Sequence, residues 1–194
     1  MTDPTFPARL TRTVDLYGRD AVARLRTGTA VVVGLGGVGA HAAVALARTG
    51  VGRLHLIDPD RVTTSSLNRH PVAGPADVGQ SKAEVLATAL ARACPDVGVT
   101  PVTGRVTATS LQELLPAASE AGPLVLVDAI DRVPDKVALL AHAVARRWPA
   151  VCSLGAAGKR DAGAVRTGSL AASRVCPLGR VLRRGLRAAG VDPA

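Results

Sequence analysis

The clearest chemical signal in this 194-residue chain is a run of glycines between residues 34 and 39, which reads Gly-Leu-Gly-Gly-Val-Gly. Glycine has no Cβ, so the backbone N–H groups of such a loop can approach an anion closely. The run follows the apolar segment Ala30–Val33 and opens a helical pattern, whose N-terminal end attracts negative charge. The pattern predicts that a nucleotide's phosphates bind at this loop, against Gly34, Gly36, Gly37 and Gly39.

A carboxylate stands where the ribose of such a nucleotide is expected. Asp58 ends the second apolar run, Leu54–Ile57, and lies 24 residues after Gly34. A carboxylate at the end of this strand suits hydrogen bonds from ribose hydroxyls. NAD and ATP sites share this feature, so it does not choose between them. Asp60 is either a second member of the same loop or a solvated side chain.

Polar residues further along the chain favour ATP over NAD. Asn68 and Arg69 lie in a loop soon after Asp58, and Lys82 opens the next predicted helix. An enzyme that cleaves ATP needs cations there, because charge builds up on the phosphates as pyrophosphate leaves. Arginine offers a planar fork to phosphate oxygens and lysine a point charge. Taken alone, Lys82 is better explained as a surface lysine of a helix, and His70 is expected at the surface.

Two carboxylates follow the fourth apolar run, Leu124–Val127, at Asp128 and Asp131. Carboxylates combined with phosphates and water suit Mg²⁺, which takes few protein ligands. We expect Asp131 to meet the metal and Asp128 to support the loop. The alternative is that one of them caps the following helix.

Apolar runs and helical patterns alternate along the whole chain. The alternation predicts an α/β fold, a Rossmann-like doubly wound and mostly parallel sheet with helices on both faces. We expect a single nucleotide-binding domain, with a helical segment over 1–28, the Rossmann-like core over 29–155 and a basic segment over 156–194. Ser81 with Glu84 predicts a capping box. The expected strands are 30–33, 54–57, 99–102, 124–127 and 150–153, and the expected helices are 14–26, 38–48, 81–93, 109–115 and 135–147.

Composition narrows the class of protein and its expected location in the cell. No segment reaches the roughly 18 apolar residues of a membrane span, and the N-terminus lacks the apolar core of a secretory signal, so we expect a cytoplasmic protein without a membrane partner. Cys94, Cys152 and Cys176 form no CxxC pair, which signals neither zinc nor redox chemistry. We expect Cys152 to be a buried strand thiol rather than a nucleophile.

Positive charge is concentrated near the C-terminus. Residues 146–194 hold 10 Lys and Arg against 2 Asp, which accounts for +8 of the total charge of +9. Clustered positive charge suits a phosphate-rich partner such as RNA. Arg180, Arg183, Arg184 and Arg187 follow helical spacing and would form one basic face. A solvated face and a tRNA-facing stripe explain this face equally well.

Together, the glycine loop, Asp58, Asn68-Arg69, Lys82 and the DxxD ending at Asp131 resemble the ThiF-like family, which includes the ubiquitin-activating enzymes. The resemblance implies that a carboxylate attacks the α-phosphate of ATP to give an acyl-adenylate and pyrophosphate. It also implies a homodimer and roles for individual residues. Asp58 would bind ribose, Arg69 and Lys82 phosphates and Asp131 Mg²⁺, while Arg9 would reach the partner's phosphates.

One branch of that family fits best. The segments 9–18, 47–52, 127–131 and 155–159 resemble the tRNA threonylcarbamoyladenosine dehydratases. These enzymes imply ATP-dependent cyclisation of threonylcarbamoyladenosine at tRNA position 37, with a sulfur-relay protein as a possible partner. Related chains continue past this length, so we expect the C-terminal part of the fold to be truncated.

Three other functions remain open from the sequence. Activation of a ubiquitin-like sulfur carrier shares the chemistry but usually brings zinc cysteines. An NAD oxidoreductase leaves Arg69, Lys82 and Asp131 without a role. A non-catalytic remnant that binds nucleotide or tRNA would bind ATP without releasing pyrophosphate.

Overall fold

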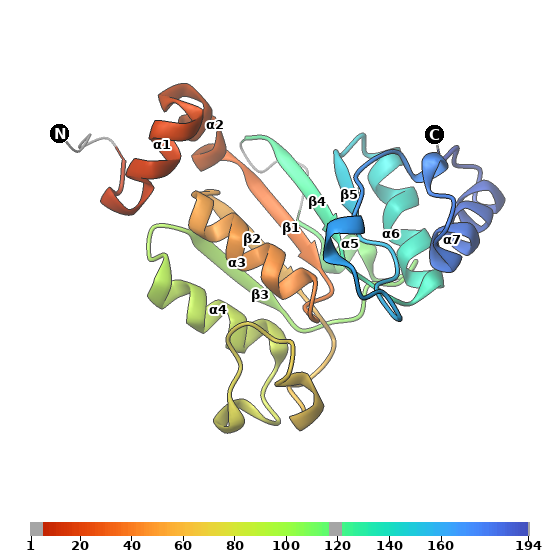
Figure 1. Ribbon diagram of the computed structural model, residues 1–194, viewed down its shortest axis with the longest axis horizontal. Coiled ribbons are helices and arrows are strands. Elements are labelled where there is room, and N and C mark those ends of the chain that lie inside the picture. The colour runs from red at the N-terminus through yellow and green to blue at the C-terminus, as the bar shows by residue number, and fades with distance from the viewer. Residues whose placement is uncertain (1–5, 117–121, 194) are drawn as a thin grey trace.

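A five-stranded parallel sheet organises the computed structural model, which describes residues 6–116 and 122–193 (Figure 1). The strand order is β3-β2-β1-β4-β5, so the direction of winding reverses between β1 and β4. The strands are β1 (Thr29–Val33), β2 (Arg53–Ile57), β3 (Gly98–Val102), β4 (Leu124–Asp128) and β5 (Ala150–Cys152). All four pairings are parallel, which confirms the predicted doubly wound α/β class.

Seven α-helices are described along with the strands. They are α1 (Thr11–Tyr17), α2 (Arg19–Thr27), α3 (Gly39–Thr49), α4 (Lys82–Ala93), α5 (Leu111–Leu114), α6 (Val133–Ala145) and α7 (Pro177–Ala188). Short 3-10 turns lie at Ala8–Leu10, Thr64–Ser66, Pro75–Asp77, Ala162–Ala164 and Leu170–Ala172. None of the helices in the described part is long and apolar enough to cross a membrane.

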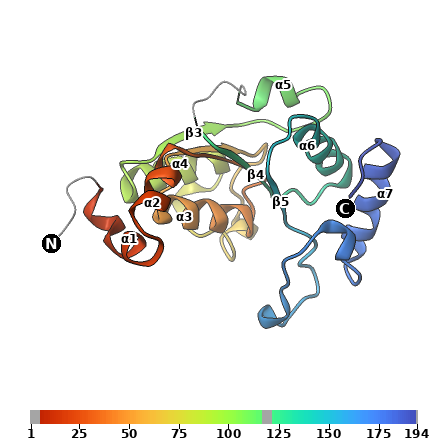
Figure 2. The ribbon, with the colours of Figure 1, turned by 90° about the horizontal axis from the view of Figure 1, so that it is seen from above.

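The helices cover both faces of the sheet, as predicted. Side chains alternate along β1, so Ala30 and Val32 pack against α3 and α4, while Val31 and Val33 pack against α5 and α6. Figure 2 shows α3 and α5 on opposite sides of the sheet. A third apolar cluster forms where α7 packs against α6, through Leu182, Leu186 and Leu140.

Two local predictions are wrong. The expected helix over 14–26 is divided into α1 and α2 at Gly18, which adopts a left-handed φ of 81° that ends the first helix. The expected capping box at Ser81 does not form. Its hydroxyl instead bonds Thr103 Oγ1 at 2.7 Å, beyond the end of β3. A contact with a distant loop thus replaces the local cap.

An ion-pair cluster ties the N-terminal segment to the edge of the sheet opposite the glycine loop. Arg9 donates from Nε and Nη2 to the two carboxylate oxygens of Asp96, at 2.7 and 2.8 Å. Its Nη1 also donates to Ala47 O and Arg48 O in the last turn of α3. Arg26 Nη1 adds a third bond to Asp96 at 2.7 Å. The hydrogen bonds from Arg9 come first among the causes that lower the pKa of Asp96 to about 2.

We predict that Asp96→Asn lowers the free energy of unfolding by about 1 to 2 kcal/mol at pH 7. Because the pKa of Asp96 is depressed from 3.8 to about 2, its contribution is complete above pH ~4 and is lost as the pH falls through ~2. Urea unfolding between pH 2 and 7 measures this. The control is Asp15→Asn, since its pair with Arg12 is mostly exposed. A wild-type–variant difference that stays constant down to pH 2 would contradict the assignment.

Candidate functional site

The glycine loop lies at the point where the sheet reverses, between the carboxyl ends of β1 and β4. Gly34 has a left-handed φ of 88°, and a Cβ there would lie 2.7 Å from Ala129 O. A Cβ on Gly39 would lie 1.8 Å from Gly34 O. Both positions therefore require glycine for the loop to close against the β4–α6 turn.

Gly36 has no such requirement. A Cβ there would meet no protein atom within 4 Å, and its φ is not left-handed. Gly37 faces the aliphatic stem of Arg69, whose Cδ would be 3.2 Å from an added Cβ. The loop thus has one glycine that faces open space, just before the N-terminus of α3. That is the arrangement in which backbone N–H groups can bind phosphate.

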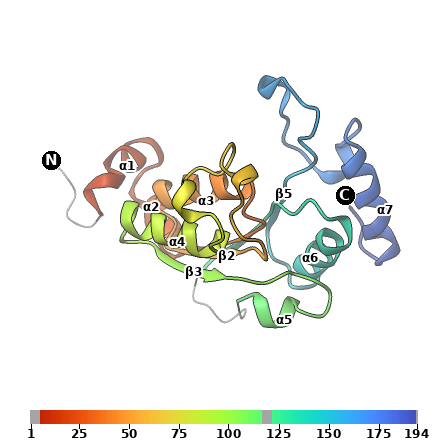
Figure 3. The ribbon, with the colours of Figure 1, turned by 90° about the horizontal axis from the view of Figure 1, so that it is seen from below.

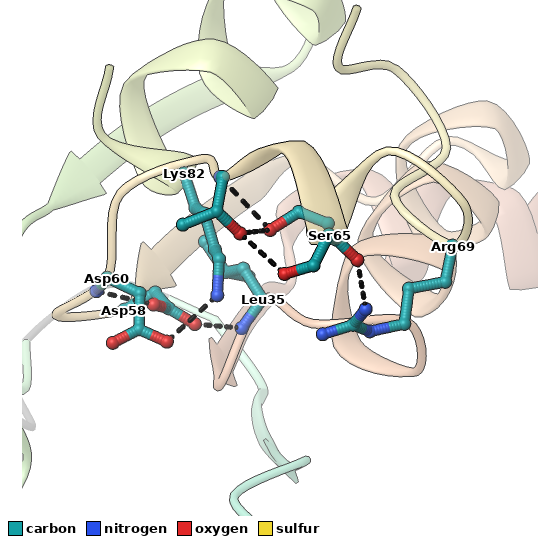
Figure 4. Close-up of polar contacts among 8 residues, drawn as sticks. Leu35, Asp58, Asp60, Ser65, Arg69 and Lys82 are labelled. Atoms are coloured by element: carbon teal, nitrogen blue, oxygen red, sulfur yellow. Dashed lines mark hydrogen bonds and ion pairs between the residues drawn. The ribbon is translucent and has the colours of Figure 1, made fainter. Parts of the chain in front are cut away.

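Asp58 lies beside this loop with its carboxylate almost fully buried, the residue being 4% exposed. Oδ2 accepts a hydrogen bond from Leu35 N at 2.5 Å, and Oδ1 accepts one from Asp60 N at 2.7 Å (Figure 4). Burial raises the pKa of Asp58, against the lowering effect of these two N–H donors. A carboxylate has about four lone-pair sites, so acceptor capacity remains for ribose hydroxyls.

Lys82 reaches the same loop from the first residue of α4. Its side chain is buried, and Nζ lies 2.8 Å from Asp60 Oδ2. Figure 4 shows the ammonium beside Asp58 and Asp60. The burial excludes the surface-lysine interpretation, and the ion pair makes Asp60 a member of the site's loop although its side chain is 58% exposed.

Arg69 comes from the loop after β2 and is exposed. Its Nη1 donates to Ser65 O at 2.6 Å and to Asn68 Oδ1 at 3.1 Å, which orients the guanidinium near the glycine loop. Asn68 is therefore a support for Arg69 in this geometry. Further Nη and Nε hydrogens stay available for phosphate oxygens.

His70 follows Arg69 and is buried, so the prediction of a surface histidine is wrong. Its Nδ1 accepts from Ala73 N at 3.1 Å. Nε2 has no hydrogen-bond partner in the described part of the chain. Burial, followed by the charge of Lys82, lowers its pKa, so the ring is neutral at pH 7.

The predicted carboxylate pair divides into one buried and one exposed residue. Asp128 ends β4 with no exposed surface, and its Oδ2 lies 2.9 Å from Lys136 Nζ. Burial raises its pKa, which the nearby Lys136 counteracts. Asp131 is exposed and makes no ion pair or side-chain hydrogen bond within residues 6–116 and 122–193.

The carboxylates at this site suit a metal ion only if the ion binds together with a nucleotide. Among the described residues, no three His, Cys, Asp or Glu side chains gather into a metal-ligand cluster. A single free carboxylate beside a phosphate site is what Mg²⁺ uses when it binds through phosphates and water. Asp131 therefore suits a metal that arrives with ATP.

Two further residues lie outside the gathered set. Arg9 bonds the far end of α3, and four of its N–H groups are used within this chain, so its reach toward a partner's phosphates stays a prediction. Burial, and then the charge of Asp128, raises the pKa of Cys152 to about 12. That value keeps Cys152 a thiol at neutral pH, as expected for a strand cysteine without a nucleophilic role.

Lys136 is the site residue that the sequence reasoning did not assign. The signal for it was a lysine inside the otherwise apolar face of α6, where a charge stands only if it is paired. Its partner Asp128 lies eight residues earlier, at the end of β4.

The fold and these side chains define a nucleotide-binding α/β domain with its ligand site at the β1–β4 reversal. The ThiF family model matches residues 8–174, and the chain belongs to this family.

Named relatives are similar over most of the chain. The tRNA threonylcarbamoyladenosine dehydratase of Escherichia coli is 37% identical over 90% of this chain and 64% of its own length. The tRNA threonylcarbamoyladenosine dehydratase 2 of Saccharomyces cerevisiae is 34% identical over 94% of this chain and 40% of its own length. The chain thus spans between two fifths and two thirds of these curated relatives.

A solved structure of the E. coli tRNA N6-threonylcarbamoyladenosine dehydratase in complex with ATP superposes with a TM-score of 0.88 at 36% identity. The alignment covers 96% of this chain and 75% of that one. The shared fold therefore extends over the glycine loop, the β4–α6 turn and the C-terminal helix.

We predict that Gly36→Ala weakens ATP binding by at least about tenfold without changing thermal unfolding, because the added methyl group fills only the space reserved for phosphate. Gly39→Ala should instead destabilise the fold, since its Cβ would overlap Gly34 O. Calorimetric titration and thermal melts of both variants measure the contrast. Equal ATP affinity of Gly36→Ala and wild type would show that phosphates do not bind there.

Proposed function

We propose that this chain adenylates a carboxylate with ATP, and that its substrate is the threonylcarbamoyl group of the modified adenosine at tRNA position 37. The observation that carries the proposal is the meeting of Asp58, Lys82 and Arg69 around the glycine loop, with the exposed Asp131 in the β4–α6 turn on which that loop closes. The similarity to dehydratases, one of which binds ATP, supports the same substrate class.

In this proposal each side chain contacts a different part of ATP. The spare acceptor sites of Asp58 take hydrogen bonds from the ribose, and the N–H groups around Gly36 hold the phosphates. Arg69 and Lys82 neutralise the negative charge that grows on the pyrophosphate as it departs. Lys82 is held for this by Asp60, whose own carboxylate is over half exposed.

The chemistry balances in two displacements. The substrate carboxylate attacks the α-phosphorus of ATP, forms an acyl-adenylate and releases pyrophosphate. A nucleophile in the same nucleoside then attacks the acyl carbon, loses its proton and expels AMP, which closes the ring. The net change in the nucleoside is the loss of one water, and the intramolecular step benefits from proximity.

Asp131 would hold Mg²⁺ in this scheme, together with ATP phosphates and water. When bound, the metal would reduce the charge of the phosphates and help to align them. Binding of Mg²⁺ to this chain is part of the proposal, on the ground that Asp131 is exposed and unpaired among the described residues.

A tRNA partner is supported by the placement of positive charge. Residues 153–176, named here the basic arm, leave the carboxyl end of β5 on the same side of the sheet as α3 (Figures 2 and 3). The arm exposes Lys159, Arg160, Arg166 and Arg174. The exposed arginines of α7 are Arg180, Arg184 and Arg187, whereas Arg183 is half-buried and bonds Leu170 O and Ser173 O in the arm.

The buried face of α7 explains why its arginines face outward. Leu182 and Leu186 pack on α6, so three of the four arginines predicted to share a face point to solvent. We propose that this surface contacts the phosphates of tRNA. A cytoplasmic location follows from a tRNA substrate, and the homodimer and the sulfur-relay partner belong to the same proposal.

We predict that the protein, given ATP, Mg²⁺ and tRNA that carries threonylcarbamoyladenosine, releases pyrophosphate and converts the nucleoside to a product lighter by one water. Lys82→Ala and Asp131→Ala should each slow both events by on the order of 100-fold, since the first removes a cation that neutralises phosphate charge and the second removes the carboxylate that would hold Mg²⁺. Pyrophosphate release and nucleoside mass spectrometry measure this.

Arg92→Ala is the matched control, because Arg92 is exposed on the same helix as Lys82 and away from the loop. ATP binding without pyrophosphate release would favour the non-catalytic interpretation. Normal rates in Lys82→Ala or Asp131→Ala would remove the role assigned to that residue.

We predict that the double variant Arg180→Glu, Arg184→Glu weakens tRNA binding by at least about tenfold. The salt dependence of binding should also become shallower, by about one unit of slope for each phosphate that the variant no longer neutralises. Filter binding at several salt concentrations measures both. The control is Arg24→Glu with Arg48→Glu, which makes the same charge change on exposed residues near the opposite edge. Equal weakening in the two double variants would indicate a general charge effect rather than a docking surface.

A further inference from the structure

An ion pair with no exposed surface lies directly beneath the site. Lys136 and Asp128 both have 0% exposed side chains, and Lys136 Nζ is 2.9 Å from Asp128 Oδ2. Burying two charges costs free energy that a hydrophobic pair of similar size would not, so such a pair rarely exists for stability alone. The backbone groups that the pair contacts therefore indicate what it does at this position.

The hydrogen bonds between the pair and the backbone go to the end of β4 and the β4–α6 turn. Lys136 Nζ donates to Ile130 O at 2.9 Å and lies 3.5 Å from Asp128 O. Asp128 Oδ1 accepts from Ile130 N at 3.1 Å. The two side chains thus hold Ile130 by both its carbonyl and its N–H, and Asp131 is the next residue.

The same backbone forms the wall on which the glycine loop rests. An added Cβ at Gly34 would come within 2.8 Å of Ala129 C and 3.1 Å of Ile130 N. Ala129 N also donates to Val33 O at 2.8 Å, which joins the turn to the end of β1. A shift of this turn would therefore displace the phosphate loop on one side and Asp131 on the other.

Lysine is rare in this sequence, and most of its lysines lie at the site. Only three of its 24 Lys and Arg residues are lysines: Lys82, Lys136 and Lys159. Two of the three are buried at the site, whereas arginine supplies nearly all the cations elsewhere. A compact ammonium on an apolar stem fits an enclosed position that the larger planar guanidinium would overfill.

We propose that Lys136 is a positioning residue for nucleotide binding, which fixes the β4–α6 turn so that the glycine loop is seated and Asp131 faces the phosphate-bound cation. This inference rests on the proposed ATP function. Lys136 has no exposed surface, so it acts through Ile130 and Asp128. The adenosine end of the nucleotide, held by Asp58, does not depend on it.

The test compares the whole nucleotide with its adenosine part. Lys136→Met leaves Asp128 buried without its cation and risks misfolding. The double variant Asp128→Asn, Lys136→Met removes both charges and keeps an oxygen that accepts from Ile130 N. It lacks the ion pair and the hydrogen bonds from Lys136 Nζ to Ile130 O and Asp128 O. Arg92→Met is the control, because it removes a cation from an exposed position on α4, away from the glycine loop.

Calorimetric titrations with a non-hydrolysable ATP analogue, with and without Mg²⁺, and with adenosine give the readouts. In the double variant we expect the analogue's Kd in Mg²⁺ to rise by about 10- to 100-fold, as for other supports of ligating side chains, with adenosine affinity and thermal unfolding near wild type. Arg92→Met should match the wild-type protein in every titration.

Two outcomes overturn the inference while ATP binding stands. One is an unchanged Kd of the analogue in the folded double variant. The other is an equal loss of analogue and adenosine affinity, which would mean general disruption of the fold. Wild-type protein that binds no analogue would instead sink the proposed function itself.

Discussion

The close contact between the glycine loop and the β4–α6 turn is the constraint on which the rest of the site depends. Gly34 and Gly39 leave no room for a side chain, because the loop must close on Ala129 for β1 and β4 to lie side by side. Once the loop is closed, the N-terminus of α3 and the open face at Gly36 point to the same space. The proposed phosphate site thus follows from strand packing, and Gly36 is the loop glycine at which an added side chain would meet no protein atom.

Paired arginines lie at the amino edge of the sheet and paired lysines at its carboxyl edge, the edges at which the strands begin and end. At the amino edge, Arg9 and Arg26 share Asp96 and fasten the N-terminal helices to the core. At the carboxyl edge, buried Lys82 and Lys136 each pair with a carboxylate of a strand-end loop. The fork of arginine suits a clamp on a carboxylate, whereas the compact ammonium of lysine suits an enclosed site.

Much of the fold and the site could be predicted because they rest on local patterns. The apolar runs placed five strands within one or two residues, and the residues at their ends were correctly expected along one edge. The failures involve contacts between distant segments. Ser81 bonds Thr103 instead of its own helix, and the burial of His70 depends on how its loop folds back. The pair of Arg9 with Asp96, 87 residues apart, is likewise a contact that no local pattern reveals. The break at Gly18 needed a backbone angle that residue type alone does not fix.

The most direct test of carboxylate adenylation traces where an oxygen atom of the carboxylate goes. In tRNA whose threonylcarbamoyl carboxylate is labelled with ¹⁸O, attack on the α-phosphate transfers one carboxylate oxygen to AMP when the ring closes. Adenylation of the carboxylate predicts AMP that carries one ¹⁸O atom for each cyclised nucleoside. Cyclised product formed alongside unlabelled AMP, with the label recovered in water or phosphate, would contradict adenylation of the carboxylate.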